Sequence, residues 1–194
     1  MVDAADQGHR NAVVKIETQA NELLTMVSTI VQATKIESGA ITVRKHEVDV
    51  CQLMQELRAL YDAPQDKNLV LVWKYPQSLP TLVTDDVLLT DILQKLIDNA
   101  IKFTQRGTVT VSARVNENIE FQVSDTGIGI PEGSLPVVFD MFKQVDSSNT
   151  REFGGVGLGL YIVKKYTELL GGTVHVESEP EKGSSFTVRI PCSA

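Results

Sequence analysis

The chain has 194 residues and a formal net charge of −7, which is long enough for one domain with a sizeable core plus an appendage. The acidic balance, without a basic stripe, argues against a nucleic-acid partner. The sequence shows neither an apolar run of membrane-spanning length nor a signal peptide, so we expect a cytoplasmic location and no membrane contact. Cys51 and Cys192 lie far apart without metal-ligand spacing, which predicts free thiols.

The N-terminal region reads as one long helix. We expect Met1–Gly8 to be a loose end, because it is polar. Beyond it, apolar residues recur at alternating steps of three and four, which is typical of a heptad seam: Val13, Ile16, Ala20, Leu23, Val27, Ile30 and Thr34. Such a face must be buried on another helix or a second chain, and Glu37–Gly39 follows as a stop and linker.

Three elements are predicted next by their periodicity. Ile41–Lys45 alternates as a strand, Val50–Tyr61 has the spacing of an amphipathic helix, and Leu69–Lys74 has the composition of another strand. We expect a loop between Pro76 and Pro80.

A second helix is predicted over Val87–Phe103, with Asp85 and Asp86 as its cap. One apolar face is formed by residues at helical spacing, namely Leu89, Ile92, Leu93, Leu96, Ile97, Ala100 and Ile101. Asn99 interrupts the helix's apolar pattern. A polar residue there either serves a ligand or bonds to the backbone, and the otherwise apolar stripe favours the ligand.

Asp125–Ile130 joins a carboxylate to a glycine turn. The strand Ile119–Ser124 alternates and ends where the glycines begin. Gly127 and Gly129 lack the Cβ atoms that would keep another molecule from the backbone, and a carboxylate beside them can accept a hydrogen bond from an exocyclic amine such as that of adenine. On its own such a motif more often marks a tight turn between strand and helix, with Asp as its hydrogen-bonding residue.

Gly154–Leu160 opens a further helix, which continues to Leu170 and stops at Gly171 and Gly172. A glycine-rich segment entering a helix N-terminus offers free N–H groups and a positive dipole end, which suit phosphate. Its spacing fits neither the phosphate loop nor the dinucleotide fingerprint. Thr173–Ser178 alternates as a strand, and Gly183–Phe186, just before Thr187–Ile190, starts a final strand.

These pieces, in this order, resemble the catalytic domain of sensor histidine kinases, within the ATPase superfamily shared with gyrase, heat-shock chaperones and mismatch-repair ATPases. Asp85–Thr104 resembles the asparagine box, Asp125–Ile130 the first glycine box, Phe139–Gln144 the phenylalanine box and Gly154–Leu160 the second glycine box. The resemblance runs from about Ala12 onward.

The resemblance implies an α+β fold: an α/β sandwich with one mixed sheet and helices on one face, preceded by one long coiled-coil-like helix. Residues 1–39 would be part of the dimerisation and phosphotransfer hairpin, ending in the linker. Residues 40–194 would be the ATP-binding catalytic domain.

The same resemblance assigns ATP and Mg²⁺ as cofactors. Asp125 would read the adenine amine, Asn99 would ligate Mg²⁺, Lys102 would reach the phosphates, and Phe103 would contact adenine or ribose or serve the core. Met141–Phe153 reads as the lid over ATP, with Phe139 and Phe142 pinning its start. The remaining nucleotide-binding residues would be Gly127, Gly129, Ile130, Gly155, Gly157, Leu158 and Gly159, with Lys143 or Arg151 at the γ-phosphate.

Two residues depart from the family pattern. Val156 stands where relatives often have Thr or Ser, which removes one hydroxyl contact. Lys95 precedes Asn99 by one helical turn, where ATP-hydrolysing relatives place a Glu and kinases commonly an Asn. A protonated lysine cannot act as a base, so it argues against the hydrolase branch, and its charge would repel Mg²⁺ unless it points at phosphate.

The family's phospho-accepting histidine is followed by an acidic residue and, five positions on, a proline. None of His9, His46 and His175 has this context, and a solvent-facing strand position is expected for His175. We therefore expect a histidine kinase fragment unable to phosphorylate itself.

The full protein would be a homodimer that transfers the γ-phosphoryl group to a histidine and onward to a response-regulator receiver domain. An ATP hydrolase of the same superfamily and a non-catalytic interaction module are the alternatives.

Overall fold

The computed structural model describes residues 2–61, 68–143 and 156–192, with side chains from residue 12 onward. Contacts divide the chain into two units, Met1–Ala40 and Ile41–Ala194. None of the described helices is both long and apolar enough to span a bilayer.

The first unit is helix α1, Val2–Glu37. The expected loose end at Met1–Gly8 is wrong, because the helix already begins at Val2. Ala4 and Ala5 are strong helix formers, and polarity alone does not oppose a helix.

Helix α1 ends at a glycine, as its sequence predicts. Gly39 adopts φ +67°, which lets Ala40 donate its N–H to the carbonyl oxygen of Lys35 at 2.9 Å. The large side chains of the heptad seam are 44 to 65 % exposed: Val13, Ile16, Leu23, Val27 and Ile30. The seam is therefore open to solvent over the described part of the chain.

The second unit is built on a mixed five-stranded sheet with strand order β2-β4-β5-β7-β6. Its strands are β2 (Leu69–Lys74), β4 (Gly107–Val115), β5 (Asn118–Asp125), β6 (Thr173–Glu179) and β7 (Gly183–Pro191). Strand β2 pairs with β4 in parallel and the other pairs are antiparallel. The predicted strands of this sheet are confirmed, including the start of the final strand at Gly183.

A second, two-stranded sheet pairs β1 (His46–Asp49) with β3 (Thr81–Thr84) in antiparallel register. The strand predicted at Ile41–Lys45 is wrong, since β1 begins at His46. The backbone N–H of Arg44 instead donates to the Asp85 carboxylate at 2.8 Å, so this segment is held by a side chain rather than a strand ladder. Strand β3 was not predicted.

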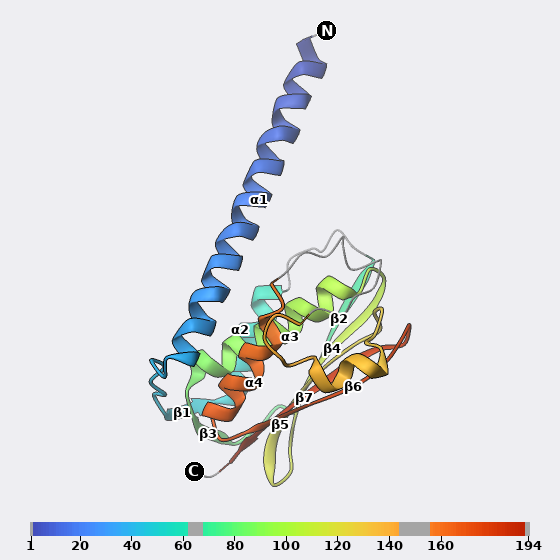
Figure 1. Ribbon diagram of the computed structural model, residues 1–194. Helices are drawn as coiled ribbons and strands as arrows, with labels where there is room; N and C mark the ends of the chain where they lie inside the picture. The colour runs from blue at the N-terminus through green and yellow to red at the C-terminus, as the bar shows by residue number, and fades with distance from the viewer. Residues whose placement is uncertain (1, 62–67, 144–155, 193–194) are drawn as a thin grey trace. The chain divides into compact units, whose positions relative to one another are not determined.

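Helices α2 (Val50–Tyr61), α3 (Asp86–Phe103) and α4 (Gly159–Leu169) lie on one face of the five-stranded sheet (Figure 1). The predicted cap of α3 is confirmed, because Asp85 accepts a hydrogen bond from the N–H of Leu88 at 3.1 Å. The apolar stripe of α3 is buried against the strands, and its members include Leu89, Ile92, Leu93, Leu96 and Ile97. The central helix is thus fixed along its length.

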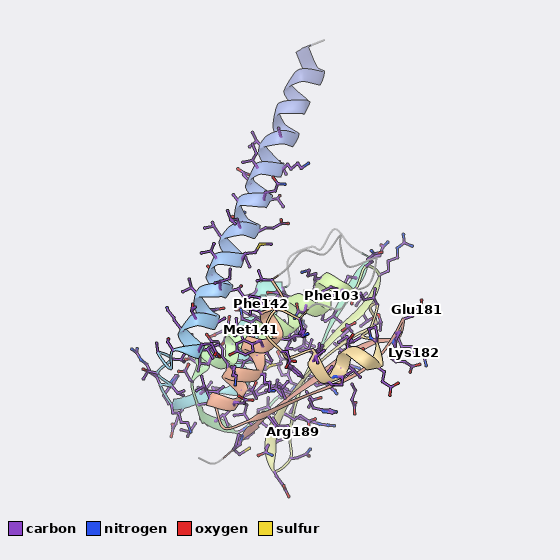
Figure 2. All side chains as sticks on the ribbon, viewed as in Figure 1. Phe103, Met141, Phe142, Glu181, Lys182 and Arg189 are labelled. Atoms are coloured by element: carbon purple, nitrogen blue, oxygen red, sulfur yellow. The ribbon has the colours of Figure 1, made fainter. Side chains whose placement is uncertain are left out.

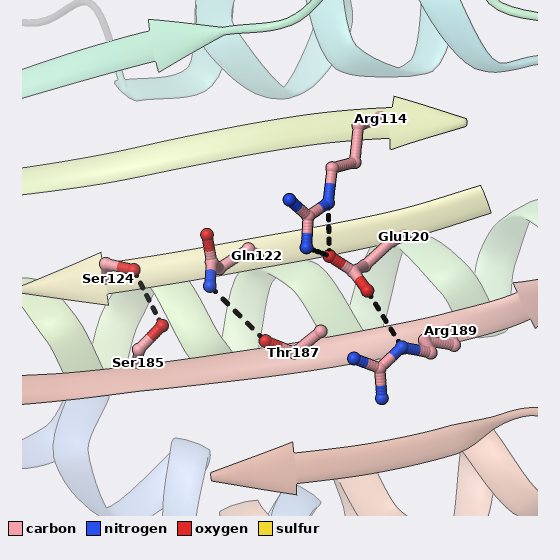
Figure 3. Close-up of polar contacts among 7 residues, drawn as sticks. All are labelled: Arg114, Glu120, Gln122, Ser124, Ser185, Thr187 and Arg189. Atoms are coloured by element: carbon pink, nitrogen blue, oxygen red, sulfur yellow. Dashed lines mark hydrogen bonds and ion pairs between the residues drawn. The ribbon is translucent and has the colours of Figure 1, made fainter. Parts of the chain in front are cut away.

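The opposite face of the sheet is polar (Figure 3). Because successive strand residues alternate between faces, Ser124 and Glu120 of β5 lie there while Phe121 enters the core. Ser124 Oγ lies 2.8 Å from Ser185 Oγ, and Glu120, only 5 % exposed, bonds to both Arg114 and Arg189. Burial opposes ionisation of Glu120, but the two guanidinium groups outweigh it and hold the pKa of this carboxyl below its ordinary value.

Candidate functional site

The C-terminal end of α3, the turn after β5 and the start of α4 converge. The Nδ2 atom of Asn99 lies 4.0 Å from the position that a Cβ would take on Gly159, the first residue of α4. Four residues further along, at the end of α3, the carbonyl oxygen of Phe103 accepts a hydrogen bond from the N–H of Ile128 at 3.3 Å. The asparagine box therefore touches both glycine boxes.

Asp125 is the last residue of β5, and its carboxylate is held by the backbone. Gly127 donates its N–H to Asp125 Oδ1 at 2.8 Å, and the backbone N–H of Ser184 also bonds to this carboxylate. Burial nevertheless dominates and raises the pKa of Asp125 above its ordinary value. Asp125 also borders an open hollow of about 400 Å³, whose other lining residues include Ser178, Lys182 and Ser184.

Close backbone approach explains the glycines of this turn. A Cβ on Gly127 would lie 2.3 Å from the carbonyl oxygen of Phe103, and one on Gly129 would lie 2.1 Å from that of Glu179. Gly129 also has φ +68°, which favours glycine. Here the glycines are required by the protein's own backbone contacts.

The turn is fastened to the β6–β7 hairpin, whose tip carries Glu181 and Lys182 (Figure 2). Ile130 is buried, at 8 % exposed, and its N–H donates to Ser178 Oγ at 2.8 Å. The N–H of Glu181 donates to the carbonyl oxygen of Ile128 at 2.8 Å. Ile130 thus anchors the turn in the core.

The second glycine box meets the end of the phenylalanine box. Gly157, at φ +72°, accepts a hydrogen bond from the N–H of Phe142 at 3.0 Å, and a Cβ on it would lie 2.7 Å from the carbonyl oxygen of Lys143. Leu158 is buried at 1 % exposed and gives α4 no side-chain cap within the described chain. Among the described residues, no N-cap side chain therefore bonds the first N–H groups of α4.

Charged residues line α3 near this junction. Lys102 Nζ lies 5.3 Å from the centre of the ring of Phe103, the last residue of α3. Lys95 Nζ lies 3.5 Å from Asp91 Oδ1, and these two side chains are 17 and 24 % exposed. The ammonium group of Lys95 is thus paired with a carboxylate of its own helix.

The other predicted residues have different outcomes. Arg151 and Gly155 lie outside the described residues, as does most of the proposed lid. Phe139 packs edge-on against Phe186 at 6.3 Å, as expected, but Phe142 is 61 % exposed and adopts φ +61°, so its pinning role is wrong. His175 faces solvent, as predicted.

Sequence reasoning missed two supports of the site. Ser178 Oγ bridges Ile130 N–H and the carbonyl oxygen of Gly183, each at 2.8 Å. A Cβ on Gly183 would lie 1.9 Å from the carbonyl oxygen of Asp125. The glycine at the start of β7 was the available signal that this strand passes directly beside Asp125.

Comparison with known proteins gives a consistent result. Residues 84–194 match the family of histidine kinase-, DNA gyrase B-, and HSP90-like ATPases. The chain is 38 % identical over 179 residues to the autoinducer 2 sensor kinase/phosphatase LuxQ of Vibrio vulnificus strain YJ016, covering 87 % of this chain and 21 % of LuxQ. It is 35 % identical over 189 residues to the signal transduction histidine-protein kinase BarA of Escherichia coli K12, covering 93 % of this chain and 21 % of BarA. The chain thus spans about a fifth of these relatives.

Solved structures agree with the fold. Full-length ShkA in complex with AMPPNP superposes with a TM-score of 0.81 at 29 % identity, over 94 % of this chain and 38 % of ShkA. The histidine kinase AdeS of Acinetobacter baumannii superposes with a TM-score of 0.75 at 21 % identity, over 94 % of this chain and 84 % of AdeS, which speaks for the fold alone. The chain belongs to the histidine kinase-, DNA gyrase B-, and HSP90-like ATPase family, and within it to the catalytic ATP-binding domains of sensor histidine kinases.

Proposed function

We propose that this chain binds ATP where α3, the turn after β5 and the start of α4 meet. Within a longer protein, it would then take part in transferring the γ-phosphoryl group to a histidine and onward to an aspartate of a response-regulator receiver domain. The observation that carries the proposal is this convergence: the Asn99 amide adjoins Gly159, and Phe103 bonds the turn that begins at Asp125.

Asp125 would bind the adenine end of the nucleotide. Its Oδ1 accepts from Gly127, and a carboxylate oxygen has a second lone pair with which to accept a proton of the exocyclic amine. The backbone of the turn at Gly127 and Gly129 would lie beside the ring, and Phe103 would contact adenine or ribose.

The phosphate end would lie over the N-terminus of α4. The N–H groups around Gly157, Leu158 and Gly159 and the positive end of the helix dipole suit an anion. Lys102 would add a charge, and Lys143 or Arg151 would bring another to the γ-phosphate. Phosphoryl transfer is catalysed by such positioning and charge stabilisation.

Asn99 would hold Mg²⁺, whose charge offsets that of the phosphates when it is bound. An amide oxygen is a hard ligand, and Mg²⁺ takes most of its ligands from phosphate and water. The described residues contain no cluster of three or more His, Cys, Asp or Glu side chains able to hold a metal. The donor set fits, because the nearby Lys95 ammonium is paired with Asp91 instead of standing uncompensated.

The same proposal extends to how the chain would assemble and to whether it phosphorylates itself. The exposed seam of α1 would pair with the rest of the dimerisation and phosphotransfer domain in a cytoplasmic homodimer. We further propose that the chain alone does not phosphorylate itself, because none of its histidines has the acceptor context. A purified chain incubated with γ-labelled ATP should then acquire no acid-labile label.

Two other functions make different predictions. A stand-alone hydrolase would turn over Mg-ATP steadily, but the base that such enzymes place one turn before Asn99 is here a lysine bound to a carboxylate. An interaction module without nucleotide would have no need of the Asp125 arrangement.

Calorimetric titration with Mg-ATP tests the proposal. We expect binding by the intact chain and a loss of more than about tenfold in Asp125→Asn, since one charge-assisted hydrogen bond is worth at least this factor. Asp86→Asn makes the same chemical change at the far end of α3 and should bind like the intact chain. If the intact chain binds no nucleotide, or both variants bind as it does, the proposal is wrong.

A further inference from the structure

Asp91, Lys95 and Asn99 lie at successive steps of four on α3 and so form one stripe, with neighbours separated by about 6 Å along the axis. Side chains on a helix lean toward its N-terminus, and Lys95 does so: its ammonium group reaches back to Asp91, away from Asn99. The position of the lysine charge is therefore set by the carboxylate.

The pair lies in the seam between helices rather than on the open surface. Helices α3 and α4 pack together, and the charge of Asp91 contributes, after burial, to a raised pKa of Tyr166 on α4. Asp91 Oδ2 is buried and has no hydrogen-bond partner among the described residues. Partly buried charges are poorly screened, so the net charge of this pair is felt one turn away at Asn99.

We propose that Asp91 is a positioning residue that holds and neutralises Lys95, and that the net charge of this pair sets the preference of the nucleotide site for Mg²⁺-bound over metal-free ATP. This inference rests on the proposed function. The intact pair has zero net charge, so a dication at Asn99 meets little repulsion. Freed from Asp91, the lysine would repel Mg²⁺ and attract the bare phosphates, which are opposite effects on the two forms of the nucleotide.

The test measures the dissociation constant of ATP in excess Mg²⁺ and in excess EDTA, and takes the EDTA value over the Mg²⁺ value as the preference ratio. Asp91→Asn leaves the pair at +1 and should lower the ratio about tenfold, which is the Coulomb interaction of one charge with a dication roughly 12 Å away, eight residues along the helix, at an effective dielectric of about 40. Lys95→Asn leaves −1 and should raise the ratio. The double variant returns to zero and should restore the ratio of the intact chain.

Glu168→Gln is the matched control, because it also removes the carboxylate of a lysine pair, Lys165 with Glu168, but on the exposed surface of α4. Its ratio should equal that of the intact chain. A packing role for Asp91 would weaken both forms of binding together and leave the ratio unchanged, so a parallel loss overturns the inference.

A ratio that falls in Asp91→Asn but is not restored in the double variant also overturns it. If circular dichroism shows that Asp91→Asn does not fold, the other two variants test the inference. The preference ratio should then rise in Lys95→Asn and equal that of the intact chain in the double variant. Should the intact chain bind no nucleotide in either buffer, the proposed function fails and this inference with it. Binding that depends on Asp125 but shows one ratio in all variants defeats this inference alone.

Discussion

Replacing Gly129 by alanine should destabilise the second unit strongly, for two separable reasons. Its φ of +68° costs an alanine about 1–2 kcal/mol. The new Cβ would lie 2.1 Å from the carbonyl oxygen of Glu179 and 2.8 Å from its carbon, and overpacking against backbone costs about 1–3 kcal/mol. Together, we expect a loss of about 2–5 kcal/mol in the free energy of unfolding.

Three other glycines separate the two contributions. Gly171 has φ +77° with nothing within 4 Å of its Cβ position, so alanine there should cost only the conformational part. Gly172 has an ordinary φ, but its Cβ would lie 2.3 Å from the carbonyl oxygen of Arg189, so alanine should cost only the contact part. Gly133 has neither problem, and alanine should be neutral or stabilise the fold by up to about 1 kcal/mol.

Urea titrations of the four variants at pH 7 measure these differences, and thermal unfolding checks them at roughly 2–4 °C per kcal/mol for a domain of this size. Because Gly171 carries only the conformational cost and Gly172 only the contact cost, the two costs together should be about as large as the cost at Gly129. If Gly129→Ala falls within about 0.5 kcal/mol of Gly133→Ala, the reasoning from backbone approach is refuted.

The remaining predictions concern two buried carboxylates. Glu120→Gln should cost about 1–2 kcal/mol by urea unfolding, less than two full charge-assisted bonds, because Arg114 is 65 % and Arg189 is 44 % exposed and both are screened by solvent. The pKa of Glu120 in the folded state lies below its ordinary value of 4.5, so its contribution to the free energy of unfolding is complete above pH 4.5 and is lost as the pH falls through the folded-state pKa. Across that pH interval, Glu120→Gln should lose less stability than the intact chain. Parallel plots of stability against pH for the two proteins would contradict this. Asp85→Ala should lower the free energy of unfolding by about 1–2 kcal/mol, measured by thermal unfolding, because the N–H groups of Leu88 and Arg44 lose their acceptor. Asp85→Asn should retain most of the stability. Equal melting temperatures for the intact chain and both variants would exclude a capping role for Asp85.

Periodicity predicted the elements whose burial is decided locally. Helix α2 and strand β2 begin and end where the apolar spacing begins and ends, at Val50–Tyr61 and Leu69–Lys74. The two-stranded sheet was not predicted because its pairing is not local. Strand β1 forms at His46–Asp49, where β3 can pair with it, and not at the alternating residues Ile41–Lys45.

The site shows the same division. The Asp125 turn and the Asn99 helix carry their own sequence signals, and they prove to be joined through the carbonyl of Phe103. The support from Ser178, a serine in an alternating strand, has no local signature, because its function arises only when the β6–β7 hairpin folds beside the turn. The stripe of Asp91 and Lys95 could be read from spacing, but the direction in which the lysine points could not.

Helix α3 also has a mechanical consequence. At its N-terminal end, Asp85 accepts a hydrogen bond from the backbone N–H of Arg44, in the segment that follows α1. The helix has 18 residues and is about 27 Å long, and its other end carries Asn99 and Lys102. Between the two ends, Leu93 and Leu96 are 0 and 1 % exposed and pack the helix into the core. A displacement of that segment would therefore be transmitted through α3 to the proposed phosphate site at the other end of the helix.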